Sequence, residues 1–306
     1  MQRYLISRLV QSIFLLLGVL VIVFFLIRLT GDPASLMVPK EAPAEQREAF
    51  RERMGFNDPI YVQFFNFSLG VIQGDFGESL RFRGTALELI LDRLPATFYL
   101  ATVALLFAIV IAVPIGIIGG SNPGSFIDSI GRALGLLGQT IPNFWLALVL
   151  ILIFAVYLGW FPSFGRDTPS SVVLPAIALG FASMGQLVRL TRSSVLEIRN
   201  EDYIRTARSK GISQLKIGAR HVFRNAALVL VSVISIQYSY LLGGSIYIET
   251  IFAWPGLGNL LQQAVDGRDF PLVQAIAFFI SFFVIVLTLL TDVAYALIDP
   301  RIRYSR

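Results

Sequence analysis

The stretch DYIRTARSKGISQLKIGARHVFRN, residues 202–225, determines how this chain is organised. It is basic and amphipathic, and long apolar runs without charged residues lie on both sides of it. In membrane proteins, loops rich in Lys and Arg lie on the cytoplasmic side of the membrane. The segment therefore predicts the orientation of the chain and marks a surface for a cytoplasmic partner.

The composition places the chain among membrane proteins. Its 306 residues are 55% hydrophobic and only 15% charged, a balance typical of that class. The absence of cysteine excludes disulfides and thiolate metal sites. Metal sites in proteins usually draw on several clustered ligands, and the chain has one histidine, His221, so we expect no metal.

Six apolar runs are long enough to cross a bilayer. A spanning helix needs about 20 mostly apolar residues, because about 30 Å of hydrocarbon is crossed at about 1.5 Å per residue. The sequence therefore predicts an all-α membrane protein with six transmembrane helices and an external segment between the first two. The predicted helices are Leu9–Ile27, Ala96–Ile118, Ala133–Leu158, Val172–Val188, Ala226–Ile248 and Phe270–Thr291.

Small residues and proline suggest how these helices pack. Gly135, Gly138 and Pro142 can bend the third helix, while Gly243 and Gly244 permit close contact of the fifth with a neighbour. We favour tight packing over a direct gating role for these residues. The first run is longer than the apolar core of a signal peptide, and we expect it to be an uncleaved anchor.

The basic residues predict the topology. Eight Arg and Lys and three acids lie between Arg192 and Arg224, a net charge of +5 that equals that of the whole chain. The positive-inside rule places this loop in the cytoplasm, and with six spans both termini lie there too. Arg189 and Arg192, just after the fourth run, are expected to extend toward the cytoplasmic headgroups.

The external segment contains short helices. We expect a surface helix over Pro43–Met54, ended by Gly55, and an aromatic stretch over Tyr61–Val71 that lies at the membrane interface or packs on the helix ends. Two interpretations stay open for this segment, a folded cap that stabilises the external face and a docking surface for a soluble partner.

The basic loop has a helical pattern interrupted by glycine. Glu197–Lys210 is expected to be helical, with Gly211 at its end because glycine accepts the left-handed conformation after a last turn. Ser213 is expected to cap a second short helix. On charge alone, binding to anionic lipid is an equally good interpretation.

Short motifs along nearly the whole chain resemble one known family. In the EAA loop of bacterial ABC-importer permeases of the dipeptide, oligopeptide and nickel branch, Arg-Thr-Ala-x-x-x-Gly precedes Arg-His-x-x-Arg-Asn-Ala. Here these motifs are Arg205-Thr206-Ala207 with Gly211, and Arg220-His221 with Arg224-Asn225-Ala226. The further matches are Gly31-Asp32-Pro33, Gln73–Ser79, Arg93–Thr97, Gly243–Ser245, Glu249–Gly258, Arg268–Pro271 and Asp299–Tyr304. Val229 departs from the pattern, because relatives usually carry proline there.

The resemblance implies a type I ABC-importer permease fold. Residues 1–94 would hold the first transmembrane helix and a periplasmic segment. Residues 95–306 would form a five-helix permease domain with the EAA loop at about 197–225. The implied partners are a second homologous permease in a heterodimer, two cytoplasmic ATPases, an external solute-binding protein and the lipid of the inner (plasma) membrane, with no nucleic acid.

The resemblance also assigns the loop residues. The EAA loop would dock on an ATPase, so that ATP-driven closure of the ATPase pair moves the helices between inward-open and outward-open states. The residues implied in this coupling are Tyr203, Arg205, Thr206, Ala207, Arg208, Lys210, Gly211, His221 and Arg224. For His221, packing within the loop is the favoured role.

ATP hydrolysis is expected in the partner subunits. The chain has no Gly-x-x-x-x-Gly-Lys-[Ser/Thr] phosphate loop, and none of its lysines, Lys40, Lys210 and Lys216, follows a glycine. We therefore expect no enzymatic activity and no cofactor in this chain, with ATP and Mg²⁺ bound by the ATPases.

Two other classes of protein compete with this interpretation. A secondary carrier or channel for a small polar solute usually needs ionisable or unwound sites at mid-membrane, whereas the predicted spans offer uncharged polar residues. A membrane enzyme would need paired carboxylates or a catalytic triad, and neither is visible.

The favoured substrate is a di- or oligopeptide; nickel complexes, glutathione-like compounds and oligosaccharides share the scaffold. The candidate pathway-lining residues are Gln139, Asn143, Gln186, Gln237 and Tyr238.

Overall fold

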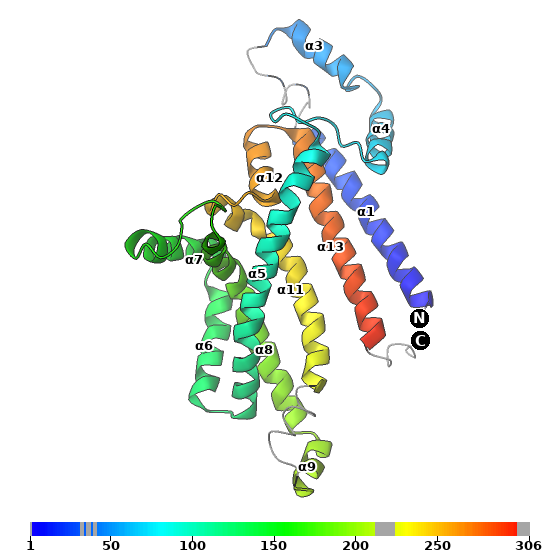
Figure 1. The fold of residues 1–306 in the computed structure, drawn as a ribbon. Helices are drawn as coiled ribbons and strands as arrows, with labels where there is room; N and C mark the ends of the chain where they lie inside the picture. Colours follow the sequence, from blue (N-terminus) through cyan, green and yellow to red (C-terminus); the bar gives the residue numbers. More distant parts are fainter. Residues whose placement is uncertain (1, 31–33, 35–37, 39–41, 212–223, 299–306) are drawn as a thin grey trace. The chain divides into compact units, whose positions relative to one another are not determined.

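The computed structural model describes residues 2–30, 34, 38, 42–211 and 224–298, and the regular structure of these residues is helical apart from an isolated bridge between Glu78 and Thr85 (Figure 1). This confirms the predicted all-α class. In chain order the elements are α1 (Gln2–Thr30), α3 (Ala44–Arg53), α4 (Ile60–Gln73), α5 (Ala86–Ser121), α6 (Phe126–Thr140), α7 (Asn143–Leu150), the π-helix η1 (Ile151–Tyr157), the 3₁₀ turn η2 (Pro169–Val172), α8 (Val173–Arg199), α9 (Asp202–Ser209), α11 (Arg224–Ile251), α12 (Leu257–Asp266) and α13 (Phe270–Ile298).

Length and composition identify the helices that can cross a membrane. Within the described residues four helices qualify, and one bent pair makes a fifth candidate. The helix α11, which is 28 residues long, covers the range predicted for the fifth span. The count of six spans stays a prediction. The four qualifying ranges are Ile6–Phe25, Ala86–Ser121, Pro169–Arg199 and Phe270–Val293.

The third predicted span is not a single helix. The chain turns by 106° between α6 and α7, so the prediction of one helix over Ala133–Leu158 was wrong. The turn falls at Ile141 and Pro142, where Ile141 is extended (φ −85°, ψ 119°), as steric conflict with a following proline favours. Pro142 therefore bends the chain, as predicted, and the helix that follows loosens into a π-helix over Ile151–Tyr157.

The chain folds as two compact units. Unit 1 comprises Phe98–Trp254 and Leu287–Arg306, and unit 2 comprises Gln2–Thr97 and Pro255–Val286. The predicted boundary between residues 94 and 95 stays a prediction.

The core of unit 1 forms around α8. Met184, Leu187 and Val188 of α8 are buried together with Ala108 and Ala112 of α5. Small residues on α5 let the backbones come close, and close backbone packing is what associates helices in lipid, where there is little hydrophobic drive between them.

Glycines on α8 make the closest of these contacts. A Cβ atom added at Gly180 would lie 2.5 Å from the carbonyl oxygen of Ala104, and one at Gly185 would lie 2.8 Å from the carbonyl oxygen of Leu134 and 3.0 Å from the Cα of Gly138. These positions admit only glycine because the neighbouring atoms are backbone. Gly138 of α6 thus serves tight packing, the role favoured from the sequence.

The close helix contact predicted at Gly243 and Gly244 is not made by the described residues of this chain. A Cβ atom added at Gly243 or Gly244 of α11 meets nothing within 4 Å among the described residues. Both glycines are exposed, so no helix of the described chain packs closely against them.

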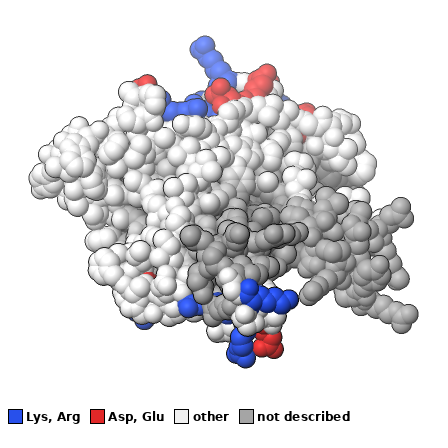
Figure 2. Space-filling view, turned by 60° about the horizontal axis from the view of Figure 1, so that its bottom comes forward, with Lys and Arg blue, Asp and Glu red and all other residues white. Residues whose placement is uncertain are grey.

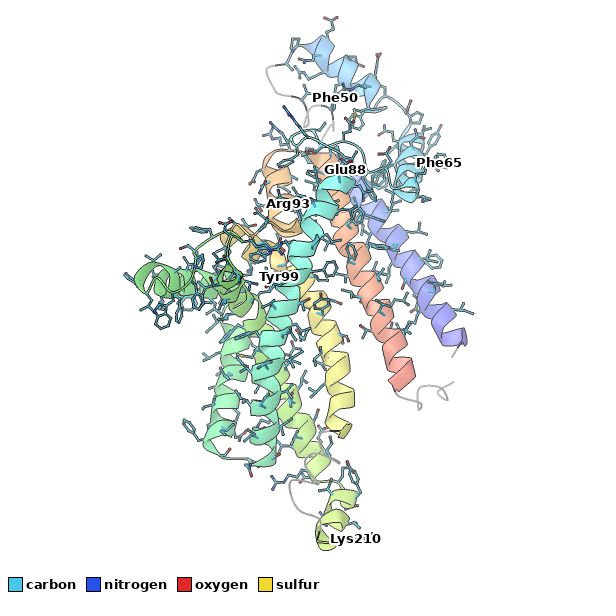
Figure 3. All side chains as sticks on the ribbon, in the orientation of Figure 1. Phe50, Phe65, Glu88, Arg93, Tyr99 and Lys210 are labelled. Carbon is cyan, nitrogen blue, oxygen red and sulfur yellow. The ribbon has the colours of Figure 1, made fainter. Side chains whose placement is uncertain are left out.

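An aromatic cluster holds the loop that precedes α8. Trp254 is fully buried and stacks on Tyr99 of α5, with ring centroids 6.2 Å apart and 11° between the planes. The guanidinium of Arg166 lies 5.3 Å from the Tyr99 ring and 5.6 Å from the Trp254 ring. The amide of Gly165 donates to the carbonyl of Phe252 at 2.9 Å. Figure 3 shows Tyr99 on α5.

The core of unit 2 lies between the start of α5, α12 and α13. Apolar side chains from these three helices, among them Ile90, Leu260 and Ile276, are buried together. The backbone amide of Leu257 donates to the Thr97 hydroxyl at 2.8 Å, which joins the start of α12 to α5.

A buried carboxylate completes unit 2. Asp269 precedes α13 and caps it by accepting from the amide of Leu272 at 3.3 Å. Its other oxygen accepts from the Ser79 hydroxyl and from the amides of Leu80 and Arg81 at 3.0 and 3.2 Å. Asp269 is fully buried, so these donors compensate for the lost water. Two motifs from distant parts of the sequence therefore form one structural joint.

The external segment folds as two short helices. The predicted helix over Pro43–Met54 is α3, ended by Gly55 with φ +68°. The aromatic stretch is α4, and its Phe64 and Phe67 rings pack on Phe24 of α1 at centroid distances of 5.1 and 5.7 Å. This confirms packing on a transmembrane helix.

The glycine contacts of α8 make a prediction for stability. Gly185→Ala places a Cβ against the α6 backbone, and overpacking of this kind costs about 1–3 kcal/mol. Gly243→Ala, where the space is open, should be neutral or stabilise the exposed helix by up to about 1 kcal/mol. Thermal unfolding of the two variants in detergent compares them; equal melting temperatures would contradict the contact.

Candidate functional site

The short helix α9 lies in the basic loop. The prediction of one helix over Glu197–Lys210 was wrong, because α8 ends at Arg199 and α9 starts at Asp202. At the break, the amides of Asn200 and Glu201 donate to carbonyls three residues earlier, at 3.1 and 3.2 Å. Such tightened turns are common where a helix ends, and they let α9 take a direction of its own.

Among the described side chains of α9, that of Ile204 is buried and anchors the helix. Ile204 has 0% exposure and packs with Val195 of α8, and Ile117 of α5 and Ile198 of α8 lie against this pair. A displacement of α9 must therefore move or break contacts with two long helices of unit 1.

The remaining described side chains of α9, and that of Lys210 directly after it, are exposed. Tyr203 is 44% exposed, and Arg205, Thr206 and Lys210 are exposed as well; Figure 3 shows Lys210 at the far end of the helix. An ion pair joins Arg205 to Asp202 at 3.6 Å, but both side chains are more than 80% exposed, so it adds little stability. We call Tyr203, Arg205, Thr206 and Lys210 the α9 face.

The charged side chains visible in Figure 2 gather at the upper and lower edges of the view. Most of the surface in Figure 2 carries neither basic nor acidic side chains, as contact with lipid requires. An exposed helix with several polar and basic groups is therefore a distinctive surface of unit 1.

Gly211 ends this helical segment as predicted. Its φ is +77°, in the left-handed region, and it is exposed, with open space where a side chain would project. The amide of Lys210 donates to the carbonyl of Thr206 at 3.2 Å. Glycine adopts this backbone conformation without the steric cost that a Cβ brings.

The other predicted coupling residues are only partly visible. Ala207 and Arg208 belong to α9 and Arg224 begins α11, but their side chains lie outside the described residues, as do Ser213 and His221 altogether.

A buried ion pair near α9 was not predicted from the sequence. Asp128 of α6 is 1% exposed, and its carboxylate accepts from Nε and Nη2 of Arg192 of α8 and from the amide of Gly124 at 2.9 Å. Ser125 caps α6 by accepting from the amide of Asp128 at 3.2 Å. Arg192 thus has a protein partner, whereas the sequence suggested that it extends toward lipid headgroups. A Ser-x-x-Asp capping pattern at 125–128 was the available signal.

The predicted pathway residues fall into separate places. The Gln237 side chain, 3% exposed, accepts from the Ser183 hydroxyl at 3.0 Å and donates to Gln186 at 2.6 Å, joining α11 to α8. Gln139 accepts from Arg189 at 3.2 Å, and Asn143 is half-buried beside the Pro142 bend. The structure therefore brings Gln186 and Gln237 together but not the whole set.

Tyr238 lines a cavity. Its hydroxyl lies 3.0 Å from that of Thr102, and the cavity beside it measures about 470 Å³. The other lining residues are Leu105, Ile234, Ser235, Leu287, Leu290 and Thr291. In the described part of the chain, no group of three or more His, Cys, Asp or Glu is placed to hold a metal ion.

Two family descriptions match almost the whole chain. The family described as "Binding-protein-dependent transport system inner membrane component" matches residues 112–304, and its N-terminal counterpart matches residues 1–101. An oligopeptide transport system permease protein of Bacillus subtilis (strain 168) is 39% identical over 316 residues, covering 99% of this chain and 100% of the relative. A glutathione transport system permease protein of Salmonella choleraesuis (strain SC-B67) is 39% identical over 306 residues, covering 100% of both.

Solved structures share the fold. The MetNI methionine ABC transporter in an inward-facing conformation has a chain with a TM-score of 0.59 at 20% identity, covering 69% of this chain and 96% of its own. An amino acid ABC transporter crystallised with histidines gives a TM-score of 0.56 at 16% identity, with 68% and 94% covered.

The Ile204 anchor makes a prediction for the mobility of α9. Ile204→Ala removes the side chain that holds the helix, and truncations of this kind cost about 2–5 kcal/mol when fully buried. Hydrogen exchange of the amides in residues 202–209 should become faster. Arg205→Ala, on the exposed side, is the matched control and should leave exchange nearly unchanged; similar rates in both variants would rule out the anchor.

Proposed function

The chain belongs to the family of binding-protein-dependent transport system inner membrane components, and from that premise we propose that α9 is the surface on which a cytoplasmic ATPase docks. The protein is a multi-pass inner-membrane permease subunit of an ABC importer, and it is not itself catalytic. An importer of this kind works with ATPase subunits and a binding protein.

The observation that supports docking at α9 is its division into one buried anchor and an exposed polar face. Ile204 holds the helix to α5 and α8, while the α9 face leaves its side chains open to a partner. A surface that only bound anionic lipid would need positive charge but no such connection to the bundle. The anchor therefore favours mechanical coupling over lipid binding.

The proposed mechanism follows from this geometry. Closure of the ATPase pair on ATP draws α9 along, and Ile204 passes the displacement to α5 and α8. Because tightly packed helices move as units, the bundle changes between inward-open and outward-open states. ATP contributes only through its different affinity for the two states of the ATPases.

The proposed assembly has a second homologous permease beside this chain, two ATPases on the cytoplasmic side of the membrane and a solute-binding protein on the external side. One permease then forms half of the translocation pathway. The net charge of +5 over residues 192–224 supports a cytoplasmic position for α9 and for both termini.

The proposed substrate is a di- or oligopeptide. One relative is named for oligopeptide transport and another for glutathione, which is itself a small peptide. The polar groups that Gln237 and Tyr238 contact, those of Ser183, Gln186 and Thr102, are uncharged hydrogen-bonding groups. Groups of this kind suit passage of a flexible molecule with amide groups without tight binding.

Gly211 provides a test of docking. Gly211→Val forces a β-branched residue to φ +77°, a strain of about 1–3 kcal/mol, whereas asparagine tolerates this conformation. We expect the ATPase to co-purify with Gly211→Val about 5- to 140-fold less well, since about 1–3 kcal/mol corresponds to that factor. Gly211→Asn should retain it. Full retention and full uptake with the valine variant would remove the support for docking at α9.

The substrate is tested through the binding protein. The assembled importer is purified with its external binding protein, and mass spectrometry identifies what that protein carries. Peptides of a few residues are expected. A metal complex or an oligosaccharide as the sole cargo would contradict the peptide assignment while leaving the ATP-driven mechanism intact.

A further inference from the structure

The turn between α5 and α6 is tied to α8 directly beside the α9 anchor. Asp128, at the start of α6, is almost fully buried and bonded to Arg192. Burying the Asp128 carboxylate costs free energy that its contact with Arg192, which is 24% exposed, must first offset, so the pair contributes little net stability compared with apolar packing. The pair joins the start of α6 to α8, the helix on which α9 is anchored. Stability alone therefore does not explain why a charged pair lies at this place.

A continuous series of packing contacts and hydrogen bonds connects this ion pair to α9. Ile204 of α9 packs on Val195 of α8. Val195 in turn lies against Gly120 of α5, where an added Cβ would come within 2.7 Å of the valine Cβ and 2.8 Å of the Arg192 carbonyl oxygen. Arg192 then reaches Asp128 of α6. Three long helices thus meet within one turn of the α9 anchor.

A second side-chain hydrogen bond from α8 holds the turn between α5 and α6. Arg199, the last residue of α8, donates from Nη1 to the carbonyl of Ser121, the last residue of α5. The amide of Gly124, in the turn itself, donates to Asp128 at 2.9 Å. The turn over residues 121–128 is therefore held from both ends by side chains of α8 and by its own carboxylate.

We propose that Asp128 and Arg192 are positioning residues that join the α5–α6 turn, α8 and α9 into one lever, so that displacement of α9 by the motor reaches α6 as well as α8. This deepens, and rests on, the proposed docking at α9. Displacement of α6 matters because α6 leads into the 106° bend at Pro142. Without the ion pair, the start of α6 can lag behind α8 when α9 moves, because the close backbone contact of α6 with α8 lies further along, at Gly138.

The first experiment measures uptake per ATP in the complete importer, reconstituted with its partner permease, ATPases and binding protein. Asp128→Asn removes the charge and keeps the shape of the side chain. We expect uptake per ATP hydrolysed to fall about fivefold or more, the lower end of coupling between sites, while the ATPases still co-purify. Arg192→Lys, which keeps a cation near Asp128, should retain more coupling than Arg192→Gln.

A matched control separates coupling from general charge loss. Arg132 lies 3.8 Å from Asp128 but is 57% exposed, and Arg132→Gln leaves the buried pair intact. Its uptake per ATP should equal that of the wild type. A merely structural role of the pair would reduce the number of intact complexes, which lowers uptake and ATP hydrolysis together and leaves their ratio unchanged. An unchanged ratio in Asp128→Asn therefore overturns the proposal, as does loss of ATPase binding in that variant.

The second experiment needs no change in the ion pair and decides the matter if Asp128→Asn does not fold. The chain has no natural cysteine, so Ser129→Cys on α6 and Ser209→Cys on α9, both exposed, accept spin labels specifically when cysteine-free partners are used. Their distance should be the same in the nucleotide-free and ATP-trapped importer. A shift larger than the width of the distance distribution would show that α6 and α9 move separately, contrary to the proposal.

Failure of this inference can be distinguished from failure of the proposed function. If only the lever is wrong, Gly211→Val still weakens ATPase binding while Asp128→Asn changes nothing. If docking at α9 is wrong, Gly211→Val leaves ATPase binding at the wild-type level whatever the ion pair does.

Discussion

Direct backbone contact between α8 and its neighbours is the constraint on which unit 1 depends. At Gly180 and Gly185 the helix lies so close to α5 and α6 that any side chain would collide with backbone atoms. In lipid, helices associate through such packing because the surrounding chains are as apolar as the side chains. Close contact of this kind does not deform gradually, and it therefore transmits a displacement from one helix to the next.

Hydrogen bonds and an ion pair also join the helices of unit 1 and the segments of unit 2. In unit 1 the Gln237, Ser183 and Gln186 side chains join α11 to α8, and Asp128 with Arg192 joins α6 to α8. In unit 2 the carboxylate of Asp269 gathers four donors from two segments. Gln237, Ser183, Asp128 and Asp269 are buried, so removing a partner of any of them leaves a buried polar group with fewer hydrogen bonds.

Local features of the chain were predictable from the sequence, and contacts between distant segments were not. The apolar runs, the helix over α3 and the left-handed Gly211 follow from composition and from backbone sterics, which depend on neighbouring residues. The sequence has no glycine or proline at the break after α8, at Asn200, so the break was not predicted. The ion pair of Asp128 with Arg192 joins residues 64 apart, which only the fold can bring together. For the same reason the motif at Gln73–Ser79 was recognised as a family match, but its joint with Asp269 was not.

The joint at Asp269 also has a consequence for biosynthesis. Ser79 and Asp269 are 190 residues apart, and a ribosome adds about 5–20 residues per second. The segment around Ser79 is therefore made about 10–40 s before Asp269, and its amide donors lack this acceptor until then. Unit 2 can be completed only after Asp269 and the start of α13 have been made, so a nascent chain released early would leave an incomplete unit 2 as a substrate for quality-control proteases.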